Sequence, residues 1–165
     1  MLREHAYRPC QRTRAQGGNA ADYPPDAGIR AEGYSGDFTG DHNCRETEEP
    51  ARAVSKLLKN ALSISETPPT GSWRTFNGWT WRDHEYSTVD ALKLPETVRN
   101  ARKGSPDADK AKNGGYVWED CGPRIDFIYV SDGIRVKSYA THNDPRPNTK
   151  LYPSDHFPIT AVIEL

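Results

Sequence analysis

Three short segments of the chain carry residue types that could do acid–base chemistry beside a cation. They are Gly36-Asp37-Phe38-Thr39, Arg124-Ile125-Asp126-Phe127-Ile128 and Ser154-Asp155-His156-Phe157-Pro158, and each lies within an expected strand or at its end. A carboxylate can orient or deprotonate a water molecule, and an imidazole can donate or accept a proton near neutral pH. The segments are far apart in the sequence, so only a folded sheet could bring them together.

Asp126, in the second segment, is expected to need a hydrogen-bonding or charged partner. It shares a strand face with Ile128 and Val130, so its carboxylate points where an apolar side chain is expected. Burying a lone carboxylate is costly unless it is paired or hydrogen-bonded. His156, just ahead of the final expected strand, is the natural partner. A carboxylate on one imidazole nitrogen fixes the tautomer and raises the basicity of the other nitrogen, which then faces a substrate.

Asp155 would point to the opposite side of the strand start from His156 and could help to hold a divalent cation. Mg²⁺ or Mn²⁺ prefers hard oxygen ligands and needs few of them from the protein. Water and substrate phosphate fill the remaining positions. The sequence therefore predicts Mg²⁺, or Mn²⁺ in its place, as the cofactor.

In order and approximate spacing, the three segments resemble the three C-terminal motifs of the endonuclease/exonuclease/phosphatase family. That family includes DNase I-like nucleases, abasic-site endonucleases and inositol-polyphosphate phosphatases. The resemblance covers about residues 34 to 165. It implies an α+β chain that forms the C-terminal part of a DNase I-like four-layer α/β sandwich, with mixed sheets flanked by helices, and leaves that sandwich incomplete.

The resemblance also implies an activity and a role for each matched residue. The activity is metal-dependent hydrolysis of a phosphate mono- or diester by in-line attack. Asp37 would orient or deprotonate the attacking water, and Asp126 would hold His156. His156 would stabilise the phosphoryl transition state, and Asp155 would lie in the metal site, directly or through water.

The chain departs from the family pattern in two places. Thr39 stands where the family has an Asn that contacts the scissile phosphate, and its hydroxyl offers one donor on a shorter reach. Asn43, four residues on, is an alternative donor. Residues 1–33 contain no match to the family's early Asn, to its metal-anchoring Glu or to its central His or Tyr motif. The chain is therefore predicted to be a fragment, a mispredicted gene product or a remnant.

Two further functions compete with hydrolysis. A non-catalytic remnant would keep the C-terminal sheet of the fold and act as an interaction module. A sequence-independent nucleic-acid binder is disfavoured by the balance of 22 basic and 23 acidic residues, because neutralised phosphates supply most non-specific affinity. The expected partner is a phosphoester substrate, either nucleic acid or a phosphorylated small molecule. No stable protein partner is inferred.

Length and composition bound the remaining possibilities. A chain of 165 residues suits one domain, and 13 Gly with 13 Pro imply long irregular stretches. Cys10, Cys44 and Cys121 are too widely spaced for a disulfide framework or a zinc knuckle, so we interpret them as ordinary thiols. No apolar run approaches the ~20 residues of a membrane span, and no signal peptide opens the chain. These features predict a cytoplasmic or nuclear protein without a membrane partner.

The expected elements run as follows. Residues 1–33 have few aliphatic side chains and form a disordered or irregular arm, so the partial domain occupies residues 34–165. Apolar residues spaced by three and four predict a helix over 47–62. Residues 68–123 are predicted to form a long functional loop, with a solvated insertion at 100–113.

The C-terminal third reads as β structure. Strands are expected over 124–130 and 134–140, and Asp132-Gly133 between them predicts a hairpin turn. Alternating apolar residues predict a last strand over 157–165 in the core sheet.

Two interpretations stay open from the sequence. The stretch from Trp73 to Trp81 could stack a base or a sugar while an arginine holds phosphate, or it could be a loop pinned by buried rings. Arg124 could contact phosphate or form an ion pair at the strand end.

Overall fold

The computed structural model describes residues 37–83, 85–102, 104–113 and 122–165. The predicted arm over 1–33 lies outside these residues. The elements are β1 (Asp37–Asp41), α1 (Glu49–Ser55), β2 (Lys59–Asn60), α2 (Thr88–Leu92), α3 (Glu96–Arg99), α4 (Pro106–Asn113), β3 (Asp126–Val130), β4 (Arg135–Thr141) and β5 (Ile159–Glu164).

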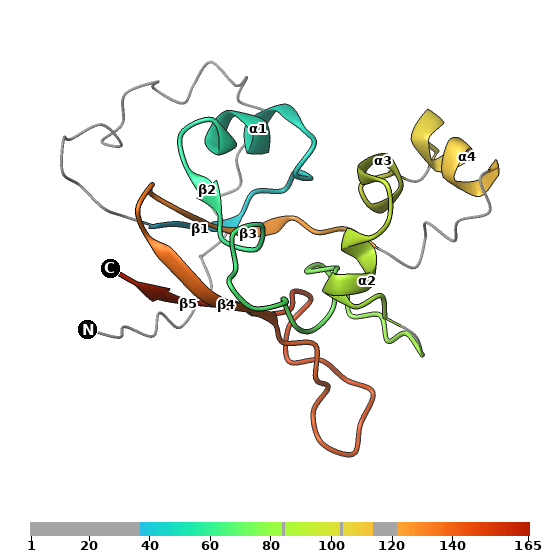
Figure 1. The fold of residues 1–165 in the computed structure, drawn as a ribbon. Coiled ribbons are helices and arrows are strands. Elements are labelled where there is room, and N and C mark those ends of the chain that lie inside the picture. The colour runs from blue at the N-terminus through green and yellow to red at the C-terminus, as the bar shows by residue number, and fades with distance from the viewer. Residues whose placement is uncertain (1–36, 84, 103, 114–121) are drawn as a thin grey trace, which may run out of the picture.

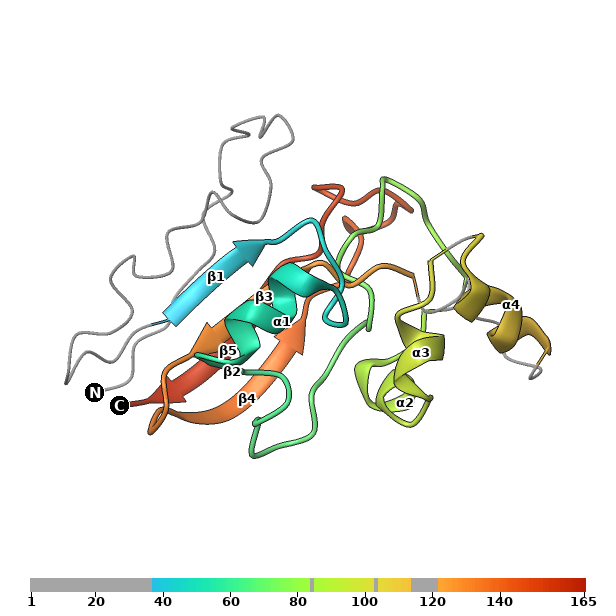
Figure 2. The same cartoon turned by 90° about the horizontal axis from the view of Figure 1, so that it is seen from above.

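Two small antiparallel sheets form the centre of the molecule, and α1 lies over the first of them (Figure 1). The first sheet has the order β1-β3-β2, and the second pairs β4 with β5. Viewed from above, α1 lies over the strands and runs roughly along their direction, while α2, α3 and α4 lie to one side of both sheets (Figure 2). These small sheets and few helices agree with a partial α+β fold.

The central strand β3 is buried along its whole length because it has a layer on each face. Phe127 and Tyr129 pack with Leu58 on the side of α1. Ile128 and Val130 point the other way, into the core between the two sheets. That core consists of Ala61, Leu62, Trp73, Ala91, Ile128, Val130, Ile134, Val136, Tyr139, Ile159 and Ile163.

The predicted hairpin between β3 and β4 is wrong. The turn at Asp132-Gly133 is present, with Gly133 at φ +87°, but it leads the chain from one sheet to the other. Both edges of β3 are already paired, with β1 on one side and β2 on the other, so β4 has no free edge of β3 to join. It pairs instead with β5, whose Ile159 and Ile163 are buried as the alternating pattern predicts.

The predicted helix over 47–62 is also too long. Helix α1 ends at Ser55, and Lys59 and Asn60 then pair with Val130 and Tyr129 as the short strand β2. The ladder with β3 replaces the helical hydrogen bonds, which is a tertiary contact overriding a local pattern. The apolar residues beyond Ser55 are still buried, because Leu58 packs beneath α1 and Leu62 reaches the core between the sheets.

The stretch over 68–123 is not one long loop. It contains α2, α3 and α4, and α4 lies within the predicted solvated insertion. These helices have four to eight residues, too short for the apolar periodicity that marks a helix in sequence. Residues 72–75 are buried, and isolated bridges join Thr70 to Ala140 and Phe76 to His156. We call residues 70–78 the inner strap.

Within the described residues, no helix combines the length and the apolar character needed to cross a bilayer.

Candidate active site

The structure brings Asp126 and His156 into direct contact. Nδ1 of His156 lies 2.9 Å from Oδ2 and 3.1 Å from Oδ1 of Asp126. The Asp126 side chain is almost fully buried at the start of β3, whereas the imidazole is partly exposed. A buried carboxylate on the strand face of Ile128 has therefore found the partner that its burial requires.

The inner strap is hydrogen-bonded to both segments that carry this pair. The Thr75 hydroxyl accepts hydrogen bonds of 3.0 Å from the backbone N–H groups of both Ile125 and Asp126. The N–H of Phe157 donates to the carbonyl of Thr75 at 2.7 Å, and the edge of the Phe76 ring packs against the imidazole of His156. Thr75 is fully buried and so links the two segments that carry the pair.

Asp41 is the second carboxylate of the cluster. The register of β1 on β3 places Asp41 directly opposite Asp126, and its Oδ2 lies 3.9 Å from Nε2 of His156. That distance is too long for a direct hydrogen bond, so Nε2 can still donate to a third group. The ligating atoms of Asp41, Asp126 and His156 all lie within 4.8 Å of one another.

Asp37, which was expected in this position, lies at the other end of β1. It is exposed and pairs with Val130, four residues from Asp41. A strand rises about 3.3 Å per residue, so Asp37 is displaced by about 13 Å along β1. The Gly-Asp pair occurs twice, at 36–37 and at 40–41, and strand pairing selects the second copy.

The second copy also resolves the mismatch at Thr39. Thr39 is exposed, two residues before Asp41 on the same face of β1. Asn43 stands two residues after Asp41, where the family motif has its Asn, and its N–H donates to Oδ1 of Asp41 at 2.8 Å. Its left-handed backbone, at φ 52°, closes the turn that presents both side chains. The signal Gly40-Asp41-His42-Asn43 was thus available in the sequence.

The charges around His156 favour its protonated form. The hydrogen bond to Asp126 raises the pKa of His156 above its usual range, and burial of the imidazole opposes this only in part. The charges of Asp126, Asp41 and Asp155 also raise this pKa. Carboxylates directly opposite on paired strands repel each other, so a cation between Asp41 and Asp126 is stabilising. The imidazolium of His156 can be that cation.

Asp155 does not belong to this cluster in the part of the chain that the structure describes. Its carbonyl accepts hydrogen bonds from the N–H groups of Asn77 and Gly78, at 2.8 and 3.1 Å, which fixes the loop that carries His156. The buried side chain of Asn77 adds a bond to the carbonyl of Ser154 at 3.0 Å. Asp155 itself is partly exposed, so its carboxylate can still take a ligand.

Arg124 neither faces solvent nor forms an ion pair with any residue that the structure describes. Only 1% of the residue is exposed, which leaves no surface for a phosphate. Its guanidinium lies 5.2 to 5.4 Å from the ring centroids of Trp73, Phe127 and Tyr139 and donates to the Tyr139 hydroxyl. Cation–π contacts replace the expected ion pair, so the residue belongs to the core.

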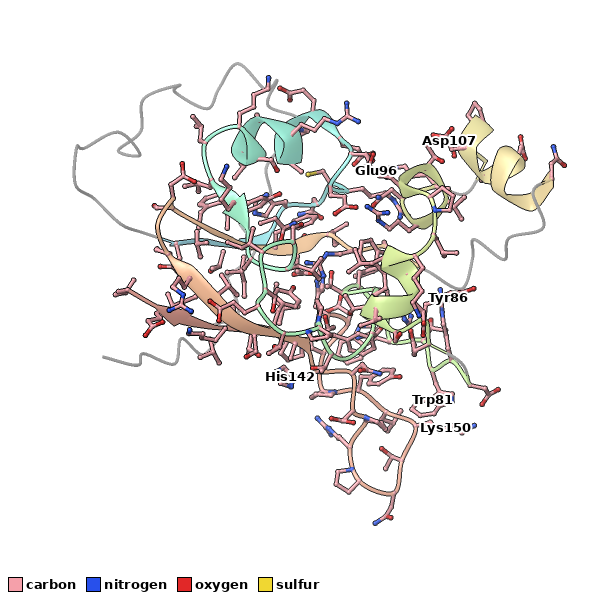
Figure 3. All side chains as sticks on the ribbon, viewed as in Figure 1. Trp81, Tyr86, Glu96, Asp107, His142 and Lys150 are labelled. Atoms are coloured by element: carbon pink, nitrogen blue, oxygen red, sulfur yellow. The ribbon has the colours of Figure 1, made fainter. Side chains whose placement is uncertain are left out.

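The three tryptophans between Trp73 and Trp81 differ in their surroundings. Trp73 is fully buried in the core. Trp81 stacks on Tyr152 and has Lys150 over its ring. Figure 3 shows Trp81 and Lys150 close together on two different loops of the molecule. Trp79, by contrast, is 63% exposed.

Comparison with solved structures places this geometry in a known fold. The structure resembles that of the mannosyl-6-phosphatase of Bacteroides thetaiotaomicron VPI-5482, with a TM-score of 0.51 and 22% sequence identity. The match covers 82% of this chain and 40% of the phosphatase. A conserved protein of unknown function from Enterococcus faecalis V583 matches with a TM-score of 0.50 and 22% identity, over 79% of this chain and 36% of that protein. An endonuclease/exonuclease/phosphatase family protein from Bacteroides thetaiotaomicron matches with a TM-score of 0.49 and 24% identity, over 81% and 38%.

The resemblance to the endonuclease/exonuclease/phosphatase family is confirmed, as a likeness of fold. The chain spans between 36% and 40% of the length of the solved structures that it matches. No protein-family model matches the sequence, and no curated protein matches it.

Proposed function

We propose that the chain carries the C-terminal part of the active site of a metal-dependent phosphoesterase that hydrolyses a phosphate mono- or diester. One observation carries the proposal: the imidazole of His156 bonds to buried Asp126 through Nδ1 and turns Nε2 toward the carboxylate of Asp41. An acid and a base thus lie side by side, as hydrolysis by in-line attack requires.

Each residue of the cluster has a role in this scheme. The carboxylate of Asp41 orients the attacking water and accepts its proton. Nε2–H of His156 donates to a non-bridging oxygen of the phosphoryl group and stabilises its developing charge. Asp126 keeps the ring oriented and its pKa high, and so acts as a positioning residue. The exposed side-chain amide of Asn43 adds a second donor to the phosphate.

We propose Mg²⁺ or Mn²⁺ as the cofactor, with Asp155 as a ligand, directly or through water. The donor chemistry fits, because Mg²⁺ is often held by one or two carboxylates together with substrate phosphate, and Asp155 offers a partly exposed carboxylate next to His156. Such a cation neutralises charge on the non-bridging oxygens. The cluster within the described residues contains no Glu. We propose that the metal-anchoring Glu and the remaining strands of a four-layer sandwich come from neither residues 1–33 nor the described residues.

The substrate is proposed as a class only: nucleic acid or a phosphorylated small molecule. A sugar phosphate is one candidate in that class. The match to a mannosyl-6-phosphatase structure supports it.

The first test is hydrolysis of bis(p-nitrophenyl) phosphate and p-nitrophenyl phosphate by the purified chain, with Mg²⁺, with Mn²⁺ and with EDTA. We expect turnover that depends on the cation and falls by about 10²- to 10⁴-fold in His156→Ala, the usual effect of losing a general acid or base. His142→Ala is the matched control, because the His142 ring is exposed and bonds only to Thr160 within the described structure. Equal activity in His156→Ala and wild type would refute the proposed site.

A second candidate is binding without turnover, as in a remnant that keeps the C-terminal sheet. It is favoured by the absence of a Glu from the described cluster. It predicts that phosphate esters bind and that binding weakens in His156→Ala, while no cation supports hydrolysis.

A further inference from the structure

Trp79 is a large aromatic residue that stays mostly exposed in the part of the chain that the structure describes. It is 63% exposed, and its ring makes no aromatic contact with any residue that the structure describes. The other tryptophans described between 73 and 81 behave differently, since Trp73 is fully buried and Trp81 is stacked on Tyr152. An exposed indole leaves a large apolar surface in contact with water. A ligand that covers the ring would bury this surface, which favours binding.

The backbone at Trp79 is held in a conformation that a bulky residue rarely adopts. Its φ is 62°, in the left-handed region, and it directly follows Gly78 at φ 58°. Local propensity would favour Gly or Asn at this position. Strain of this kind persists where the surroundings fix it, and it gathers at ligand-binding and catalytic sites.

The surroundings that fix Trp79 are those of the proposed active site. Oδ1 of Asn77 accepts the N–H of Trp79 at 2.8 Å, and the N–H groups of Asn77 and Gly78 both donate to the carbonyl of Asp155. Trp79 is thus one residue from a direct backbone bond to the residue that precedes His156. Asn77 is almost fully buried, so the turn cannot shift without disturbing the loop of His156.

We propose that Trp79 is a substrate-binding residue that stacks on a ring in the organic part of the phosphoester, and that the substrate class is therefore a ring-bearing phosphate, a nucleotide or a sugar phosphate. This inference rests on the proposed phosphoesterase site for the position of the phosphate. An indole offers a flat face to a nucleobase or to the apolar side of a sugar ring, and such stacking tolerates different rings. A ringless phosphate ester would gain nothing from Trp79.

The test measures dissociation constants by calorimetry for AMP, mannose 6-phosphate and glycerol 3-phosphate in the presence of Mg²⁺. The variants are Trp79→Gly, which removes the ring, and Trp79→Phe, which keeps an aromatic face. Leu165→Ala is the matched control, because Leu165 is exposed at the far end of β5 from His156. Binding is the readout, so failure of turnover alone would count against the proposed hydrolysis and leave this inference standing.

We expect wild type to bind at least one ring-bearing phosphate more tightly than glycerol 3-phosphate. In Trp79→Gly that preference should fall about tenfold, the typical effect of losing one stacked ring, while Trp79→Phe keeps most of it. The two ring-bearing ligands distinguish a nucleobase from a sugar. Equal binding of all three phosphates to wild type, or an unchanged preference in Trp79→Gly, would overturn the inference.

Thermal unfolding separates recognition from a structural role. Because Gly accepts a left-handed backbone without strain, Trp79→Gly should keep or raise the Tm of the chain. A ring that pins the turn would instead lower the Tm when removed. A lower Tm with an unchanged preference for ring-bearing ligands would contradict the proposal.

Discussion

The imidazole of His156 lies between two carboxylates that the fold treats differently. Asp126 is buried and bonds to Nδ1, whereas Asp41 is partly exposed and stands 3.9 Å from Nε2. A buried partner fixes the ring, and a solvated partner can exchange protons with water. The asymmetry suits a site in which one carboxylate positions the imidazole and the other acts on a water molecule.

Asp41 and Asp37 offer a direct test of which Gly-Asp pair is functional. In Asp41→Asn, an amide replaces the carboxylate and cannot take a proton from water, so kcat should fall by about 10²- to 10⁴-fold. Asp37→Asn is the matched control on the same strand and should retain wild-type activity, since Asp37 pairs with Val130 at the far end of β1. Phosphodiester hydrolysis under saturating Mg²⁺ measures both. A larger loss in Asp37→Asn would return the site to the first Gly-Asp pair.

The pKa of His156 should depend on Asp126. The hydrogen bond to that carboxylate is the main cause that raises this pKa, so Asp126→Asn should lower it toward the value of a free imidazole. A titration of the imidazole signals by NMR measures the change, and Asp37→Asn should leave the His156 curve in place. An unchanged His156 pKa in Asp126→Asn would show that the pairing is not formed in solution.

The raised pKa of His156 also predicts how the free energy of unfolding should vary with pH. Because the folded pKa of His156 is raised, its contribution is fully present below the unfolded value of 6.5 and is lost as pH rises through the folded value. The deficit in unfolding free energy of Asp126→Asn relative to wild type should therefore be larger on the acidic side of that window than on the alkaline side. Urea unfolding at several pH values measures it.

At the scale of elements, the site depends on the inner strap over residues 70–78. This strap bonds to β4 at one end, to the start of β3 in the middle and to the loop of His156 at the other. No part of it is a regular strand. Some of its bonds go to residues 11 to 17 positions away, such as Glu85 and Thr88, but those that reach the site join it to distant segments at Ile125 and Phe157. Packing, rather than local propensity, therefore sets its path.

Gly71 marks the tightest contact of the strap. A Cβ at Gly71 would lie 1.7 Å from the carbonyl oxygen of Thr141, and the backbone is left-handed at φ 81°. Gly71→Ala should therefore lower the free energy of unfolding by more than about 3 kcal/mol, because backbone must move. Gly133→Ala is the matched control: φ is 87° but the space is open, so the expected loss is about 1 kcal/mol. Urea unfolding compares them, and equal losses would contradict the close approach.

At the scale of the whole molecule, charge is balanced in total, and on β4 it is also balanced locally. The formal net charge is −1, and the exposed cations of β4 are matched by acids. Arg135 pairs with Glu66 and Glu164, and Lys137 pairs with the same two residues. Arg135 and Lys137 are therefore not free to neutralise a nucleic-acid backbone.

Salt dependence tests this conclusion. For binding to duplex DNA, the slope of log K against log salt concentration counts the phosphates neutralised, and we expect a magnitude below about 3. Fluorescence anisotropy with a labelled duplex measures it. The double variant E66Q/E164Q frees Arg135 and Lys137 and should steepen the slope. A steep slope in wild type would point to a basic nucleic-acid surface that the balanced charge does not predict.

The partnership of Asp126 and His156 was determined by the sequence alone. A carboxylate on the buried face of an apolar strand demands a partner, and a histidine directly before the last strand was the residue able to supply one. The need of Asp126 for a partner follows from the two-residue period of a strand and the cost of burying charge, and neither depends on how the strands are arranged.

Only the tertiary structure decided which acid completes the cluster. Asp37 and Asp41 each follow a glycine, and although Asn43 follows only the second of them, it is the register of β1 on β3 that places Asp41 beside His156. The turn at Asp132-Gly133 was likewise visible, but the pairing of β3 on both edges decided that it would join two sheets. Strand register and sheet membership arise from contacts between distant segments, and a local pattern does not contain them.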